Sequence, residues 1–354
     1  MATTERSGLL VLVGGPAERG RQHGEALRER VQAAVGRFLD DAAGRTGMSG
    51  QRYVAQFLGE TGFHRAMAAH TPDLVTELAG IAEGAGVAAD ELLAYNLLDE
   101  EWWYSETLRS KCSALAVPAC GGHPGLVAQT MDLPRSMDGG QVLLHHRHPD
   151  GREVAVLSSA GFLGLTGCNA DGVGICVNAL GMLHHDARGL PVACVVRGAL
   201  DRPTAAAAAA FVRSVPHASG QHYALVDRSG DAYGLECSAG GTTESASGTR
   251  PFFHANHPLA SDDVDPAVTR DLTQVESSRR RQAALESAGP AVATRADCRA
   301  LLSERTAPIC VSRGDAGGWL TFGAVATELG DTVTIDVALG PPDDTPWIEL
   351  ELGR

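Results

Sequence analysis

The sequence changes its pattern at Cys112, and this change limits the possible folds more than any other feature. Before Cys112, apolar residues recur mostly at helical spacing, whereas after it short apolar runs alternate with turn signals. Cys112 stands at the head of one such run, 112–118, and a second run, 125–132, ends on the carboxylate of Asp132. The sequence therefore predicts a helical block in front of layered strands.

The separate runs of helix and strand indicate an α+β fold with two sheets layered between helices. Asn169-Ala170-Asp171-Gly172 marks a hairpin turn between two of the strands. Before Cys112 we expect a strand at 9–13 and helices at 17–44, 50–69, 72–87 and 89–104. After it we expect strands at 112–118, 125–132, 141–148, 153–160, 163–168, 173–179, 222–227, 232–237, 319–328 and 331–338, with helices at 189–201, 203–213, 274–287 and 294–305.

Charge and composition exclude several classes of function. A formal net charge of −14 and a pI near 5.3 argue against nucleic acid or an anionic membrane as the main partner. No apolar run approaches the ~18 residues of a membrane span. The first residues lack the basic and apolar regions of a signal peptide, so a cytoplasmic location is expected.

Neither the cysteines nor the histidines have the spacing of a metal site. The eight cysteines form no C-x-x-C pair. Of the histidines in 142–148, strand alternation sends His146 and His148 to one face and His145 to the other. We therefore expect no metal and no cofactor.

Cys112 is the strongest candidate for chemistry. A chain cut before Cys112 would expose a thiol together with a free α-amine, which is a nucleophile with its own base. Asp132 could orient a substrate or that amine, or it could cap a turn. Asn178 interrupts an apolar strand and must find buried partners.

Two further segments carry polar candidates near strand or helix ends. Residues 252–258 hold His254, Asn256 and His257. The Asn256 amide could stabilise an oxyanion, a contribution of about 3–4 kcal/mol, or it could satisfy loop backbone. The segment 19–24 could place Arg19 beside the nucleophile, or its glycines could allow two helices to approach closely.

Taken in order, these segments resemble the isopenicillin-N acyltransferases (acyl-coenzyme A:6-aminopenicillanic acid acyltransferases), which belong to the self-processing N-terminal-nucleophile cysteine hydrolases. The resemblance covers most of the chain. The matching segments are Arg19-Gly20 with Gly24, Cys112-Ser113, 129–132, 159–164, 167–174, 177–180, 233–236, 254–259, 278–282 and 308–310.

The resemblance implies a four-layer αββα sandwich preceded by a helical pro-segment. It further implies self-cleavage between Lys111 and Cys112, giving two chains, 1–111 and 112–354, that stay associated. Cys112 would form an acyl thioester, with its α-amine moving the proton. Asn256 and a backbone N–H near Asp132 would hold the oxyanion, and Asp132 would position the amine. The acyl group would pass from a small N-acylated metabolite or an acyl thioester to water or to an amine.

The sequence departs from the family pattern at three positions. Lys111 stands before the nucleophile where the penicillin enzymes have glycine, and Thr130 stands where they have asparagine. The family's arginine after 309–310 is replaced by Val311, and Arg313 lies two residues on, on the same face of a strand. On the resemblance, Thr130, Arg19 and Arg313 are the candidates for substrate binding.

Three alternatives to a self-processed acyl-transfer enzyme remain open from the sequence. The chain could be an unprocessed member of the fold that binds small acyl compounds without catalysis, as Lys111 favours. It could be a cysteine hydrolase with an internal Cys112 and His254 or His257 as the base. It could also be a metal-dependent hydrolase that uses the histidine clusters.

Overall fold

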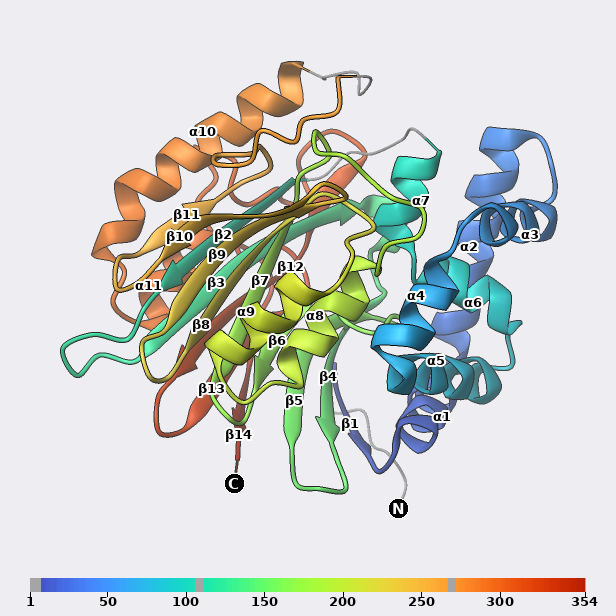
Figure 1. Ribbon diagram of the computed structural model, residues 1–354, viewed down its shortest axis with the longest axis horizontal. Helices are drawn as coiled ribbons and strands as arrows, with labels where there is room; N and C mark the ends of the chain where they lie inside the picture. The colour runs from blue at the N-terminus through green and yellow to red at the C-terminus, as the bar shows by residue number, and fades with distance from the viewer. Residues whose placement is uncertain (1–7, 106–110, 267–271, 354) are drawn as a thin grey trace.

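Two β-sheets form the centre of the molecule (Figure 1). The computed structural model describes residues 8–105, 111–266 and 272–353. The eight-stranded sheet has the order β1-β4-β5-β6-β7-β8-β9-β10, and the six-stranded sheet has the order β11-β2-β3-β12-β13-β14. All neighbouring strands pair antiparallel except β1 and β4, which are parallel.

The bounds of the strands follow the predicted runs closely. The eight-stranded sheet consists of β1 (Leu9–Val13), β4 (Gln141–Arg147), β5 (Glu153–Ser159), β6 (Thr166–Asn169), β7 (Val173–Ala179), β8 (Gln221–Asp227), β9 (Ala232–Ser238) and β10 (Gly241–Ser247). The six-stranded sheet consists of β11 (Phe252–His254), β2 (Lys111–Val117), β3 (Gly125–Pro134), β12 (Trp319–Leu329), β13 (Val333–Ala338) and β14 (Trp347–Leu352).

Helices cover the outer face of each sheet. Helices α8 (Val192–Leu200) and α9 (Ala205–Ser214) pack on β7, β8 and β9 of the eight-stranded sheet. Helices α10 (Leu272–Ala288) and α11 (Arg295–Leu302) pack on β2, β3 and β12 of the other sheet. A separate hydrophobic cluster fills each of the three interfaces between these four layers. The predicted α+β class and αββα layering are confirmed.

Small side chains and one amide join the two sheets. On β2, Ala114 and Ala116 alternate toward the opposite sheet, where small residues let the two backbones approach. On β3, the Gln129 amide accepts from the Val177 N–H at 3.0 Å and donates to the Val177 carbonyl. This pair fixes β3 against β7 across the space between the two sheets.

The N-terminal block contains more helices than the sequence predicts. Its helices are α1 (Pro16–Ala26), α2 (Arg28–Thr46), α3 (Gly50–Glu60), α4 (Phe63–His70), α5 (Pro72–Ala85), α6 (Ala89–Tyr95) and α7 (Leu98–Tyr104). The predicted helix 17–44 breaks at Leu27, which leaves helical geometry with ψ of 23°. The predicted helix 50–69 breaks at Thr61 and Gly62, where the Gly62 N–H bonds the Ala187 carbonyl instead of continuing a helix.

Glycines allow α1 and α5 to pack with their backbones almost in contact. A Cβ on Gly20 would lie 2.1 Å from the Glu77 carbonyl oxygen, and one on Gly24 would lie 2.2 Å from that of Ile81. Gly80 and Gly84 on α5 face the backbone of α1 in the same way. The glycines of segment 19–24 therefore serve a close helix approach, one of the two interpretations open from the sequence.

Three edge strands and one turn differ from the prediction. Strands β10, β11 and β14 were not among the predicted strands, because β10 is polar and largely exposed, β11 has only three residues, and β14 follows a Pro-rich stretch. The predicted strand 163–168 begins only at Thr166, because positive φ angles at Gly161 and Gly164 turn the chain first. In the part of the chain that the structure describes, no helix is both long and apolar enough to span a bilayer.

Candidate active site

The sheet register brings three predicted residues together at one end of the six-stranded sheet. Cys112 is the second residue of β2 and lies opposite Met131, so Asp132 lies opposite Lys111. The pairing of β11 with β2 places His254 opposite Ala114. Continuing that register by two residues puts Asn256 beside Cys112. The structure thus brings Cys112, Asp132 and Asn256 together.

Asn256 and Arg281 hold the backbone of Cys112 on both sides. The Cys112 N–H donates to Asn256 Oδ1 at 2.6 Å, and Arg281 Nη1 donates to the Cys112 carbonyl oxygen. Arg281 Nη2 also donates to Asn256 Oδ1 at 3.0 Å. Asn256 Nδ2 in turn donates to the Ala179 carbonyl at 3.0 Å, and the Asn256 N–H donates to Ser278 Oγ at 2.7 Å. The Asn256 side chain is therefore fixed from both sheets and from α10.

Asp132 is a buried carboxylate with one firm partner. Thr321 Oγ1, directly across from it on β12, donates to Asp132 Oδ1 at 2.7 Å. Burial raises the pKa of Asp132 to about 6, although the Thr321 hydrogen bond and the charges of Arg281 and Lys111 lower it. This carboxyl group can therefore exchange a proton near neutral pH.

The Cys112 thiol is neutral in the uncleaved chain. Burial raises its pKa to about 12, with a further contribution from the Asp132 carboxylate. The backbone N–H of Asp132 and the charge of Arg281 act in the opposite direction. The Asp132 N–H thus lies within hydrogen-bonding reach of the sulfur. Because the thiolate is the reactive form, a proton acceptor is needed.

Cys112 opens into a small, mostly apolar cavity of about 40 Å³. This volume holds a few water molecules or a short acyl chain, since one water needs roughly 10–15 Å³ measured in this way. Besides Cys112 and Asp132, the polar side chains that line it are Asp99 and Gln221. Its apolar wall includes Leu98, Trp102, Met131, Leu133, Phe162, Leu165, Val177 and Val196. The cavity suits an acyl group bound next to a thiol.

Two of the three expected substrate-binding residues lie outside this cavity wall but close in sequence to it. Thr130 is buried, and its Oγ1 donates to the Ile309 carbonyl at 3.0 Å, on the helix-covered side of β3. Arg313 is partly exposed and pairs with Asp138 and Asp344. Neither side chain is among those that line the cavity.

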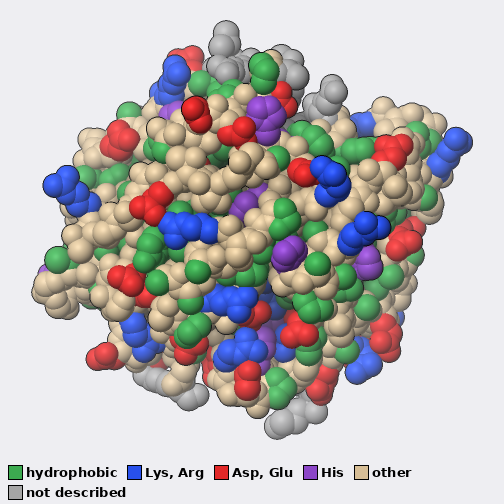
Figure 2. Space-filling view, in the orientation of Figure 1, with side chains coloured by type: hydrophobic (Ala, Val, Ile, Leu, Met, Phe, Trp, Pro, Cys, Tyr) green, Lys and Arg blue, Asp and Glu red, His purple; other side chains and the backbone are tan. Residues whose placement is uncertain are grey.

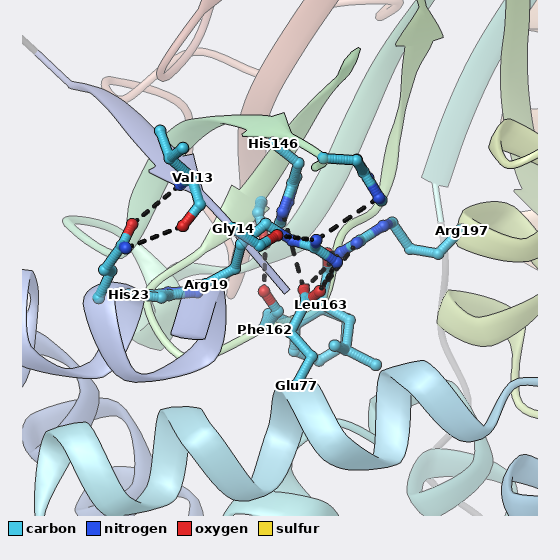
Figure 3. A network of polar contacts seen from close by, with 12 residues as sticks. Val13, Gly14, Arg19, His23, Glu77, His146, Phe162, Leu163 and Arg197 are labelled. Atoms are coloured by element: carbon cyan, nitrogen blue, oxygen red, sulfur yellow. Dashed lines mark hydrogen bonds and ion pairs between the residues drawn. The ribbon is translucent and has the colours of Figure 1, made fainter. Parts of the chain in front are cut away.

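Arg19 lies in a buried ion network instead of beside the nucleophile (Figure 3). Its guanidinium contacts Glu77 on α5 at 3.0 Å, and Arg197 on α8 contacts the other oxygen of Glu77 at 2.9 Å. His146 on β4 lies 3.8 Å from the same carboxylate. Because these partners hold Arg19 away from the cavity wall, its expected role in substrate binding is not supported by its position.

The two histidines considered as alternative bases have other partners. The His254 ring bonds the Ala255 carbonyl through Nδ1 and Glu236 through Nε2, each at 2.9 Å. His257 Nδ1 bonds Ser278 Oγ at 2.8 Å. Over residues 8–105, 111–266 and 272–353, no group of three or more His, Cys, Asp or Glu side chains is placed to hold a metal ion.

Arg281 is the main site residue to which sequence analysis gave no role. The segment 278–282 was matched to the family as a whole, but its three arginines are adjacent and look alike. Helical spacing separates them, since Ser278, Arg281, Gln282 and Leu285 are buried while Arg279 and Arg280 are exposed. In the sequence, Arg281 could have been recognised as a charged residue on the apolar face of the predicted helix 274–287.

Comparisons with known proteins agree with the resemblance seen in the sequence. The family model described as acyl-coenzyme A:6-aminopenicillanic acid acyl-transferase matches residues 121–329, which include Asp132, Asn256 and Arg281. An acyl-coenzyme A:6-aminopenicillanic-acid-acyltransferase 40 kDa form from Emericella nidulans is 26% identical over 247 residues, 70% of this chain and 68% of the relative.

Solved structures give remote likenesses. A penicillin V acylase from Agrobacterium tumefaciens is 14% identical, with a TM-score of 0.44 over 68% of this chain and 86% of that one. A Caenorhabditis elegans N-acylethanolamine-hydrolyzing acid amidase ortholog is 13% identical, with a TM-score of 0.44 over 62% and 93%. Scores of this size carry no argument about activity. The match over 121–329 is sufficient by itself: the chain belongs to the acyl-coenzyme A:6-aminopenicillanic acid acyl-transferase family.

Proposed function

We propose that the chain cleaves itself between Lys111 and Cys112 and that the resulting enzyme carries acyl groups as a thioester on Cys112, passing them to water or to an amine of a small metabolite. The single observation that carries this proposal is the arrangement around Cys112. Its N–H donates to Asn256 Oδ1, its carbonyl accepts from Arg281, and its thiol lies against the Asp132 N–H in a cavity.

Self-cleavage requires the thiol to attack the carbonyl carbon of Lys111. The C–N bond then breaks, the thiol proton passes to the Cys112 nitrogen, and Lys111 becomes a thioester on the sulfur. Water hydrolyses that thioester and leaves a carboxylate on Lys111 and a free amine and thiol on Cys112. Asp132 is proposed to carry the proton, since its carboxylate acts on the thiol and its pKa is raised to about 6.

The free α-amine changes the chemistry available to the thiol. An α-amine has an ordinary pKa of about 8, so its neutral form can take the thiol proton at neutral pH and return it to the leaving group. Asn256 Oδ1 already accepts from this nitrogen and would orient its lone pair toward the sulfur. The Asp132 N–H and Asn256 Nδ2 are proposed to hold the oxyanion of the tetrahedral intermediate.

The partner is proposed to be a small acylated metabolite. The cavity beside Cys112 is small and mostly apolar. Figure 2 shows acidic and basic side chains interspersed over one face, on a chain of net charge −14. The fungal relative is named for an acyl transfer from coenzyme A to 6-aminopenicillanic acid, which supports an acyl thioester or an amide as the donor.

The two products, 1–111 and 112–354, are proposed to stay together. Residues from both sides of the cut line the cavity, with Leu98, Asp99 and Trp102 before it. The loop at the cavity wall is held by the N-terminal segment as well, because His23 Nε2 accepts from the Gly161 N–H and Asn96 bonds the Gly161 carbonyl. Losing the N-terminal segment would open one side of the site.

The intact mass of the purified protein tests self-cleavage. The wild type is expected to give two masses, those of 1–111 and 112–354, and Cys112→Ala a single full-length mass. A single mass for both proteins would remove the α-amine from the mechanism and leave a non-catalytic or internal-cysteine protein. Incubation of the wild type with a short acyl thioester should then add one acyl mass to 112–354, and Asp90→Asn, on the exposed surface of α6, should behave as the wild type.

A further inference from the structure

Asp99 and Gln221 form a polar section in the otherwise apolar wall of the Cys112 cavity. Asp99 belongs to α7, and Gln221 begins β8, where it pairs with Ala179 of β7. Ala179 is the residue whose carbonyl holds Asn256 Nδ2. The polar section therefore lies close to the reacting end of the cavity, where α7 and the eight-stranded sheet meet.

The hydrogen bonds within this section leave an acceptor oxygen that a donor group of a ligand could bond. Gln221 Nε2 donates to Asp99 Oδ2 at 2.9 Å and to Ser219 Oγ at 3.1 Å, which uses both amide hydrogens. Gln221 is 1% exposed, and its Oε1 has no hydrogen-bond partner within the described residues. A buried amide oxygen without a partner destabilises the folded protein, so a ligand that supplies a donor would be favoured.

A second carboxyl group, that of Glu100, lies fully buried next to Asp99 on α7. Its Oε1 accepts from the Val192 N–H at 2.9 Å, and its Oε2 is unpartnered in the described part of the chain. Burial raises the pKa of Asp99 to about 6 and, together with the Asp99 charge, that of Glu100 to about 8. A donor, above all a cationic one, would bond the carboxylate of Asp99, which is the one of these two groups that lines the cavity.

We infer that Asp99 and Gln221 make the enzyme selective for acyl groups that carry a hydrogen-bond donor, a hydroxyl or an ammonium, over plain alkyl groups of the same length. This inference rests on the proposed thioester chemistry and adds its substrate class. The donor group bonds Gln221 Oε1 and the Asp99 carboxylate while the carbonyl carbon lies at Cys112. The remaining apolar wall holds the methylene groups between them.

Helix α7 is anchored firmly enough to serve as part of a binding wall. Glu100 bonds the Val192 N–H and Ser219, and Glu101 accepts from Tyr53 at 2.5 Å and from Arg45 at 2.7 Å. These four bonds tie α7 to Ser219, just before β8, to the start of α8 and to the N-terminal helices. Asp99 is thus fixed by contacts outside the cavity.

The experiment measures kcat/KM for three series of substrates: hexanoyl amides, hydroxyhexanoyl amides and aminohexanoyl amides. In the second and third series the hydroxyl or amino group is placed on each carbon of the chain in turn. At the best position the donor is expected to raise kcat/KM by about ten- to hundredfold. Gln221→Met and Asp99→Leu should reduce this ratio toward one. Asp99→Asn should lower the preference for the amine more than that for the hydroxyl. The control Asp90→Asn should keep the wild-type ratio.

Two outcomes separate this inference from the proposed function. If Cys112 is acylated by hexanoyl donors but no donor-bearing chain is preferred, or if the preference survives in Gln221→Met and Asp99→Leu, the selectivity is refuted while the thioester chemistry stands. If no donor acylates Cys112, the proposed function fails and takes the inference with it. Should the variants not fold, calorimetric binding of hydroxyhexanoate against hexanoate by the wild type decides, since equal affinities would contradict the inference.

Discussion

At the scale of single residues, the site depends on a few side chains that share the atoms of Cys112. Asn256 Oδ1 accepts both from the Cys112 N–H and from Arg281 Nη2. Arg281 also donates to Ser113 Oγ at 3.2 Å. Removing either side chain therefore disturbs the other, and the two are expected to act as one unit in any kinetic comparison.

Asn256→Ala is expected to lower kcat by about 10²–10³-fold, because an oxyanion donor of this kind contributes about 3–4 kcal/mol. The variant should be made in protein that already starts at Cys112, co-expressed with 1–111, so that a failure to cleave does not mask the result. Single-turnover acylation by a short thioester gives the rate. A loss smaller than about fivefold would exclude Asn256 from the oxyanion site.

Arg281→Lys is expected to slow self-cleavage by about tenfold or more, since an ammonium cannot donate to three oxygens held in the plane of a guanidinium. Arg280→Lys, one residue away and exposed, is the matched control and should cleave at the wild-type rate. The ratio of full-length to cleaved mass over time gives both rates. Equal rates for the two variants would mean that the Cys112 carbonyl needs no such donor.

At the scale of elements, sequence periodicity predicted most strands and helices but not their breaks. Apolar alternation located β2, β3, β7 and β12, whose side chains are buried on at least one face. The breaks at Leu27 and Gly62 depend on packing between α1 and α5 and on a bond to the distant Ala187 carbonyl. No local pattern encodes such partners.

The candidate site, too, was predictable only where a local sequence pattern marks a residue, and not where its role depends on distant partners. Cys112, Asp132 and Asn256 stand at strand ends, where a polar residue in an apolar run is visible in the sequence. Asp99 and Gln221 gave no such signal, because each looks like an ordinary surface residue until α7 folds over β8. The prediction that Arg19 lies beside the nucleophile failed because its ion-pair partner, Glu77, is 58 residues away on α5.

Because Glu100 on helix α7 is buried, we expect the free energy of unfolding to depend on pH. The Glu100 pKa is raised to about 8 by burial and by Asp99, so the folded protein prefers the protonated group. Its stabilising effect is complete below the unfolded pKa of about 4.3 and is lost as the pH rises through about 8. Between about pH 5 and about pH 9, the free energy of unfolding of Glu100→Gln should therefore fall by about 1–3 kcal/mol less than that of the wild type.

Urea unfolding at the two pH values measures this difference. Asp90→Asn, an exposed carboxylate on α6, should show the same change with pH as the wild type. If Glu100→Gln and the wild type lose stability in parallel, the folded protein does not raise the Glu100 pKa, and the prediction is contradicted.

At the scale of the whole molecule, the Arg19–Glu77–Arg197 network joins the N-terminal helices to the sheet layers. Glu77 receives both guanidinium groups in a buried setting, and these neighbours lower its pKa well below the usual range despite the effect of burial. The stabilisation is present above the unfolded pKa of about 4.3 and is lost as the pH falls below it. The network is thus the main ionic contact between 8–105 and the rest.

Glu77→Gln is expected to destabilise the protein by about 3–5 kcal/mol, because two buried guanidinium groups lose their counter-charge. Glu83→Gln, on the same helix in an exposed pair with Arg21, should change stability by no more than about 0.5 kcal/mol. Thermal unfolding of both variants gives the comparison. In cleaved protein, Glu77→Gln should also release 1–111 on gel filtration, and similar behaviour of the two variants would contradict the role assigned to the network.

The position of the Lys111–Cys112 bond, at the first step of a central strand, has a consequence for the life of the molecule. An intact chain brings its helices to its sheets at an effective concentration in the millimolar range, as a short tether does. Once the bond is cut, the same encounter is between two separate molecules at their bulk concentration. The cleaved enzyme would therefore refold poorly. After unfolding and dilution, its two chains would meet too rarely to form the complex again.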